Sequence, residues 1–274
     1  MSSAIDVSSV CGEAAKGHER DIVAVFVRLV TAECSAEEAA ADIDKLYPVG
    51  STDAAEEFLW SFWTLLVATV KKVPATSDPD RMQPMVSMIA HLRSLRDDEV
   101  EMWGQKTRVW SELPMLGPCM RDAWNMRPMF TGTEAETESI AEWISLNSFA
   151  ARVFGAKLQS WDNFAIWEMR SGLEEPPRET TSAKDASLAT ACEWIAHAGE
   201  ALHEQGRQGR TLDAMEQRAL KPGTLFRSDR SGLGDERWRF WRERIGLFGA
   251  GAGSGELKER ARKMVEKMER LDSS

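Results

Sequence analysis

The chain has 274 residues and a formal net charge of −10 at pH 7. This acidic balance argues against a nucleic acid or an anionic membrane as partner, because both require an exposed basic surface. The longest apolar run, residues 58–70, is shorter than the roughly 20 residues that a helix needs to cross a bilayer.

The cysteine and tryptophan contents further limit which class of protein this chain can be. The four cysteines are widely spaced and form no C-x-x-C pair, which is typical of free thiols in a reducing compartment. The N-terminal residues include early acids and no apolar signal core, so we expect a cytoplasmic protein. Eleven tryptophans stand against one tyrosine. Aromatic stripes at helical spacing usually pack in a core, although they also line ligand cavities.

Helix-start signals mark the first third of the chain. A first helix is expected around Phe26, because apolar residues recur there at helical spacing. Ser35 and Asp53 are each predicted to begin a further helix, since acidic residues follow them within one turn. Asp78 is the expected cap of the next helix, with Pro79 at its first position.

The middle of the chain is rich in tryptophan and proline. The charged stretch RDDEVE, residues 96–101, is expected to be a loop or a helix start. Trp103 and Trp110 lie seven residues apart, which predicts that they share one face of the following helix. In the stretch LPMLGPCMRDAWN, residues 113–125, Pro118 is expected to start a short helix that Pro128 stops.

Helical spacing continues to the C-terminus, with helices expected over about 138–154, 158–174 and 183–205. The resulting fold prediction is an all-α protein, a single compact domain of about ten or more helices with no significant sheet. Its expected parts are a flexible N-terminal segment (1–17), a helical domain (18–248), a Gly-rich hinge (249–255) and a C-terminal amphipathic helix (256–274).

Three charged patterns were weighed as possible sites. Asp97, Asp98 and Glu101 match half of a magnesium-binding motif, but the partner motif is missing, so a charge cluster is favoured and metal binding stays open. Glu200 and His203 form a single E-x-x-H pair, whereas a di-iron bundle needs two. The arginines of residues 227–244 are expected on a solvated helix face. We therefore expect no metal and no cofactor.

The most concentrated polar group lies in residues 113–125. Arg121 and Asn125 are one helical turn apart, with Asp122 between them. Asn147 lies on an apolar stripe, where a buried amide needs a hydrogen-bond partner. A structural network that locks a corner of the fold is favoured over a catalytic site, with Arg121 and Asp122 as the catalytic candidates of the second interpretation.

Six sequence blocks resemble a large family of filamentous-fungal proteins known as a domain of unknown function. The blocks with LP-x-LGP-x-x-R-[DE]-AWN and W-[IV]-x-LN-x-FAAR spacing are the most specific. The resemblance covers about residues 53–248 and implies a fungal, intracellular, mainly helical protein. It supplies no catalytic residues or cofactor. The blocks are residues 59–63, 113–125, 143–153, 164–174, 192–199 and 232–245.

Two functions of different classes follow from these patterns. The first is a cofactor-free enzyme or a binder of a hydrophobic or aromatic small molecule, in a pocket lined by tryptophans and a few orienting polar groups. Whether the protein is an enzyme, and its oligomeric state, stay open. The second is a non-catalytic helical scaffold or regulator. The substrate-binding residues of the first hypothesis are Trp60, Trp63, Trp124, Asn125, Trp143, Asn147 and Trp167.

Overall fold

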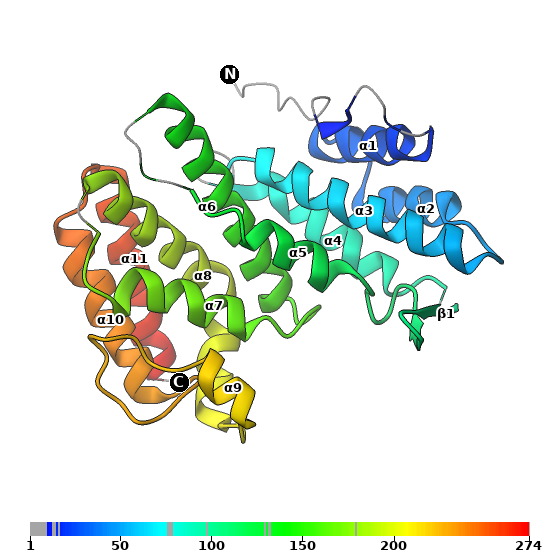
Figure 1. The fold of residues 1–274 in the computed structure, drawn as a ribbon. Coiled ribbons are helices and arrows are strands. Elements are labelled where there is room, and N and C mark those ends of the chain that lie inside the picture. The colour runs from blue at the N-terminus through cyan, green and yellow to red at the C-terminus, as the bar shows by residue number, and fades with distance from the viewer. Residues whose placement is uncertain are drawn as a thin grey trace. The chain divides into compact units, whose positions relative to one another are not determined.

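The computed structural model describes residues 10–12, 15, 17–75, 79–96, 98–128, 130, 133–178 and 180–273. These residues form eleven α-helices and one short β-hairpin (Figure 1), which confirms the all-α class. Most of the expected N-terminal segment, the expected cap Asp78 and the acidic residue Asp97 lie outside them. Contacts divide the chain into unit 1, residues 1–128 and 141–146, and unit 2, residues 129–140 and 147–274.

Unit 1 is built around α1, which packs against α2, α3 and α4. The helix start expected at Ser35 is confirmed, and it takes the form of a capping box with Glu38 as its second member. The cap of the third helix lies two residues earlier than expected, because Ser51 and not Asp53 accepts a hydrogen bond from the Ala54 backbone N–H. The elements are α1 (Gly17–Val30), α2 (Ala36–Leu46), α3 (Thr52–Lys72), the 3₁₀ helix η2 (Pro79–Met82), α4 (Gln83–Leu92) and α5 (Leu116–Trp124).

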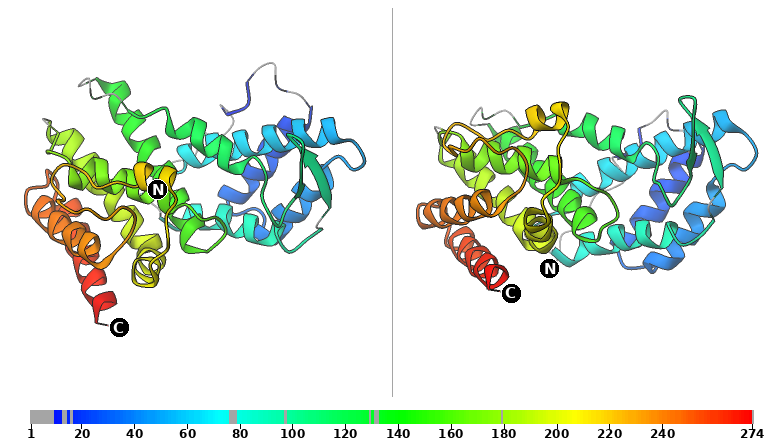
Figure 2. Two further views of the ribbon diagram at one scale, coloured as in Figure 1. Left: turned by 60° about the horizontal axis from the view of Figure 1, so that its bottom comes forward. Right: turned by 90° about the horizontal axis from the view of Figure 1, so that it is seen from below.

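A β-hairpin occupies the place of the helix expected around Trp103. Strands β1 (Glu99–Met102) and β2 (Gln105–Arg108) pair antiparallel, and β1 packs against α3 (Figure 2). Trp103 and Gly104 form the two-residue turn, with φ angles of 52° and 74°. Trp103 is therefore exposed, whereas Trp110 is buried and donates from Nε1 to Asp44. The helical prediction was wrong. Strand β1 alternates exposed and buried residues over only four positions, which is too short a pattern to recognise in the sequence beside the helical spacing of the two tryptophans.

Unit 2 is organised around the long helix α8, which contacts α7, α10 and α11. Helices α10 and α11 lie side by side (Figures 1 and 2). The buried core of the unit includes Trp194, Ile195, Leu202, Trp241 and Ile245. The elements are α7 (Asp162–Met169), the π-helix η3 (Arg170–Glu174), α8 (Thr181–Gln208), α9 (Ala214–Ala219), α10 (Asp235–Ala250) and α11 (Gly255–Asp272).

Helix α6 (Glu134–Gly155) contributes residues to both units, because residues 141–146 belong to unit 1 and the rest to unit 2. Its last residue, Gly155, approaches the backbone of α8 closely. A Cβ atom at this position would lie 2.0 Å from the carbonyl oxygen of His197. Glycine is therefore required for this close approach of the two helices.

The glycine-rich segment at residues 249–255 makes specific contacts. Gly249 belongs to the last turn of α10, and a Cβ at this position would lie 2.6 Å from the Cβ of Ala261 on α11. The backbone N–H of Gly253 donates to both carboxylate oxygens of Asp185, at 3.2 and 3.1 Å. The segment between α10 and α11 is thus shorter than the hinge expected from the sequence, since Gly255 already belongs to α11.

Candidate functional site

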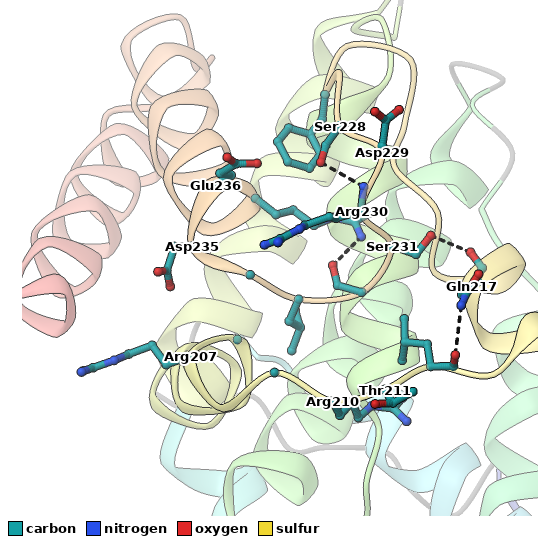
Figure 3. A pocket seen from close by; sticks show the side chains of 18 of the residues that line it. Arg207, Arg210, Thr211, Gln217, Ser228, Asp229, Arg230, Ser231, Asp235 and Glu236 are labelled. Atoms are coloured by element: carbon teal, nitrogen blue, oxygen red, sulfur yellow. Dashed lines mark hydrogen bonds between the residues drawn. The ribbon is translucent and has the colours of Figure 1, made fainter.

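A pocket of about 790 Å³ lies in unit 2, between the C-terminal end of α8 and the start of α10. We call it the arginine pocket, because Arg207, Arg210, Arg230 and Arg239 line it. Figure 3 shows Arg207 and Arg210 on the side formed by the end of α8, and Asp235 and Glu236 on the start of α10. Its volume lies within the range of several hundred to about 1,000 Å³ that is typical of small-molecule sites.

Glycines shape the backbone that surrounds the arginine pocket. Gly209 ends α8 with φ at 59°, and Gly232 turns the following loop with φ at 83°. A Cβ at Gly206 would lie 3.3 Å from the backbone nitrogen of Gly234. Gly206 thus lets the end of α8 and the loop before α10 approach each other closely, and Gly209 and Gly232 adopt backbone angles that favour glycine.

A buried ion pair fixes the loop that forms one wall of the pocket. Arg237 on α10 and Glu174 at the end of η3 are 2 % and 0 % exposed. The guanidinium donates to both carboxylate oxygens, from Nε at 2.6 Å and from Nη2 at 2.9 Å. Trp241 Nε1 and the Gly223 backbone N–H also donate to this carboxylate, at 2.6 and 2.7 Å. Such a bidentate pair with further donors satisfies the buried charge.

The remaining donors of Arg237 hold the loop itself. Nη1 donates to the carbonyl oxygens of Leu220 and Gly232, both at 2.8 Å, and Nη2 donates to that of Lys221 at 3.2 Å. The expectation that the arginines of residues 227–244 lie on a solvated face is therefore wrong for Arg237. Its acidic partner, Glu174, is 63 positions away in sequence, so spacing within the helix gave no sign of it.

The arginines of the pocket differ in how their charges are balanced. Arg210 pairs with Asp162 at 3.1 Å and with Glu216 at 2.5 Å, and the hydrogen bond to Glu216 raises the pKa of this guanidinium. Among the described residues, Arg207 and Arg230 have no ion-pair partner. Two guanidiniums that line a pocket, and that pair with no carboxylate of the described residues, are available to bind an anion.

Three carboxylates also line the arginine pocket, on Asp229, Asp235 and Glu236. Asp235 and Glu236 occupy the first turn of α10, whose N-cap residue Gly234 offers no side-chain hydrogen bond. Negative charge at this position stabilises the helix by its interaction with the helix dipole. Asp229 points away from Arg207 and Arg210 (Figure 3).

The predicted substrate-binding tryptophans of unit 1 are mostly core residues. Trp124 and Trp143 are buried, and their ring centroids lie 5.1 Å apart. Arg127 lies over the Trp143 ring, with its guanidinium carbon 5.3 Å from the centroid. Trp63 is buried against Phe62 in the aromatic core. The fourth, Trp60, is 42 % exposed on α3.

The polar residues predicted beside these tryptophans do not form a buried network. Arg121, Asp122 and Asn125 are exposed on α5 and at its C-terminal cap, so the expectation of a buried polar corner was wrong. Helical spacing placed them correctly on one helix, but it did not show which face of that short helix meets the core.

Two predicted residues of unit 2 have structural hydrogen bonds. Asn147 is buried, and its Oδ1 accepts from Trp194 Nε1 at 2.9 Å. Trp167 Nε1 donates to the carbonyl oxygen of Ala219 at 3.0 Å. None of the nine predicted site residues lines the arginine pocket. Which of them contact a ligand stays a prediction.

The candidate metal ligands are engaged with other groups. Asp98 pairs with Arg96 at 3.4 Å, and His203 Nε2 lies 3.4 Å from Asp272 Oδ1. Glu200 is largely exposed. In the part of the chain that the structure describes, no three His, Cys, Asp or Glu side chains gather closely enough to hold a metal ion.

A second buried charge cluster lies where α8 faces α11. Glu193 on α8 is buried and pairs with Arg260 of α11 and with His197 Nε2, the latter at 3.3 Å. Burial works to raise the pKa of Glu193, but the hydrogen bonds from His197, Ser148 and Arg260 together hold it below its usual range. Burial lowers the pKa of His197. Its neighbour Cys192 has a pKa raised to about 12 by burial, which makes this thiol unreactive.

Comparison with known proteins identifies the family. Residues 63–245 match the family described as "Protein of unknown function (DUF3632)", which is about two thirds of the chain, so the chain belongs to this family. No curated protein and no solved structure matches it. No helix among the described residues has both the length and the hydrophobicity needed to cross a membrane.

Proposed function

We propose that this member of the DUF3632 family binds a small organic anion, with a phosphate or carboxylate group, in the arginine pocket of unit 2. The observation that carries the proposal is the pair Arg207 and Arg230, which line a pocket without an ion-pair partner among the described residues. Guanidinium groups bind the planar and tetrahedral faces of carboxylate and phosphate with two parallel hydrogen bonds.

The rest of the lining suits a small polar molecule with a carbon skeleton. Leu212, Phe226 and Leu233 supply apolar surface, and the Thr211 hydroxyl lies beside Arg210 (Figure 3). Ser231 already donates to the Gln217 carbonyl oxygen at 2.8 Å, so this hydroxyl holds the wall in place. A few polar groups on a partly apolar wall are the usual composition of a small-molecule site.

The three carboxylates of the lining limit the charge of the ligand. Asp229, Asp235 and Glu236 would repel a polyanion, because like charges at close range repel each other. A ligand with one or two negative charges fits this balance. The net charge of −10 of the whole chain has the same consequence for nucleic acid.

Isothermal titration calorimetry with inorganic phosphate and glycerol 3-phosphate tests the proposal. We expect Arg207→Gln and Arg230→Gln each to weaken binding about tenfold or more, since a hydrogen bond to a charged group contributes roughly 1.5–3 kcal/mol. The matched control is Arg270→Gln, an exposed arginine on α11 that lies outside the pocket, which should bind as the wild type does. Equal binding by all variants, or none by the wild type, would contradict the proposal.

The two functions expected from the sequence stay predictions. A hydrophobic or aromatic ligand beside Trp124 and Trp143 is tested by a thermal-shift screen with aromatic and terpenoid compounds. A shift that Trp143→Leu abolishes and Arg230→Gln leaves intact would favour that ligand over the anion. A scaffold role gains support if neither class of compound binds.

A further inference from the structure

A small recess adjoins the arginine pocket. Its volume is about 10 Å³, which is near the minimum space that holds one water-sized group. His203 on α8 and Trp238 on α10 line it but do not line the larger pocket. The recess and the pocket share four lining residues, which are Gly206, Leu233, Gly234 and Asp235. The two cavities therefore share a wall formed by these four residues.

The indole N–H of Trp238 has no acceptor among the described residues, although the side chain is only 4 % exposed. A buried donor without an acceptor is unfavourable, and it is uncommon in folded proteins. Four other indole nitrogens of this chain donate to an acceptor, those of Trp110, Trp167, Trp194 and Trp241. Trp63 also lacks an acceptor, but it lies in unit 1 and not at this recess.

His203 supplies the complementary group. Its ring centroid lies 5.1 Å from that of Trp238. Its Nε2 lies 3.4 Å from the Oδ1 atom of Asp272, and in the tautomer that carries the proton on Nε2 this nitrogen donates toward the carboxylate. The other nitrogen, Nδ1, is then a hydrogen-bond acceptor, and it has no partner within the described ranges. Two residues that line the recess thus supply one donor and, in this tautomer, one acceptor.

We propose that this recess is a hydroxyl subsite of the arginine pocket, so that the ligand is a hydroxylated small anion. A hydroxyl group is the neutral group that accepts one hydrogen bond, from Trp238 Nε1, and donates another, to His203 Nδ1. The anionic end of the same molecule lies at Arg207 and Arg230. The inference rests on the proposed anion site for the identity of the ligand, but the recess itself can be tested without a ligand.

The first test compares two phosphates that differ in their hydroxyl groups, glycerol 3-phosphate and propyl phosphate. We expect the wild type to bind glycerol 3-phosphate about three- to tenfold more tightly, the value of one or two net hydrogen bonds. Trp238→Phe removes the N–H and retains a ring, so the ratio should fall to near one while the affinity for propyl phosphate stays the same. A ratio that Trp238→Phe leaves unchanged would overturn the subsite.

Two further variants guard against a general effect on folding. His203→Leu removes the acceptor and should lower the same ratio. Trp194→Phe is the matched control, because its N–H already donates to Asn147 Oδ1 and it lines neither the recess nor the pocket, so the ratio should persist. Arg230→Gln should weaken both phosphates equally. This pattern separates failure of the subsite from failure of the anion site.

The second test uses the ligand-free protein. A water molecule in the recess satisfies the same donor and acceptor as a ligand hydroxyl. The indole N–H resonance of Trp238, assigned by its absence in Trp238→Phe, should show a rotating-frame cross-peak to water, and that of Trp194 should not. If neither phosphate binds, the anion site fails and this measurement alone decides: a cross-peak supports the subsite, and its absence overturns it.

Discussion

Replacement of Glu174 by alanine should destabilise unit 2 more than any surface change. The substitution leaves the Arg237 guanidinium buried at 2 % exposure without its counter-ion. It also leaves Trp241 Nε1 and the Gly223 N–H without their acceptor. Removal of one partner from a buried ion pair costs about 3–5 kcal/mol. That is a large part of the roughly 5–15 kcal/mol by which a folded protein is stable.

The cost should depend on the charge that is left behind. In the double variant Glu174→Leu with Arg237→Met no charge is buried, and the free energy of unfolding should drop by less than the sum of the two single changes. The double variant still loses the contacts of Arg237 with the carbonyl oxygens of Leu220, Lys221 and Gly232. We therefore expect it to fold and yet to bind anions in the arginine pocket more weakly.

Urea denaturation followed by far-UV circular dichroism measures these free energies. Glu200→Ala is the control, because this glutamate is 78 % exposed and its nearest cation, Lys267 Nζ, is 3.9 Å away. It should change stability by less than about 0.5 kcal/mol. A loss below about 1 kcal/mol in Glu174→Ala would refute the reasoning, since a buried unpaired guanidinium cannot be that inexpensive.

Three further predictions concern other parts of the chain. Because burial lowers the pKa of His197 below its ordinary 6.5, the unfolded chain takes up this proton first, so stability should fall as the pH drops through 6.5. His197→Gln should flatten that fall in urea melts at pH 7 and pH 5.5, and an unchanged fall in this variant would contradict the prediction. Asn125→Ala, at an exposed position, should change thermal stability by less than about 0.5 kcal/mol, and a loss above 1 kcal/mol would restore the buried-corner interpretation. Gly155→Ala should cost about 1–3 kcal/mol in urea melts because its Cβ meets the α8 backbone, while Gly117→Ala, with open space around it, should be nearly neutral in the same measurement.

Local signals in the sequence located most helices, because the start and end of a helix depend on residues within one or two turns of them. Ser35, which begins α2 with a capping box, is an example. The hairpin turn at Trp103 and Gly104 was missed because a strand of four residues gives too short an alternation to compete with helical spacing.

The arginine pocket depends on partners that are far apart in sequence, so it could not be predicted from spacing. In the sequence, nothing distinguishes Arg237 from the other arginines of its charged helix, because its partner Glu174 is distant along the chain. The large number of tryptophans suggested a ligand pocket. Trp63 and Trp124 are instead buried in the protein core, where their large apolar area packs well without a ligand. The sequence signal for the pocket was the pair of glycines at 209 and 232. Both adopt positive φ angles, which glycine favours, and such positions often occur in the loops that form binding sites.

The division of α6 between the two units bears on how this chain can have evolved. Unit 1 takes residues 141–146 from a helix whose two ends belong to unit 2, so the units are interleaved along the chain and not strung one after the other. Gene fusion or recombination at a single breakpoint cannot separate them intact. A fragment that begins at residue 129 would carry Trp143 without Trp124, its ring partner. The two halves are therefore expected to be inherited, gained and lost together.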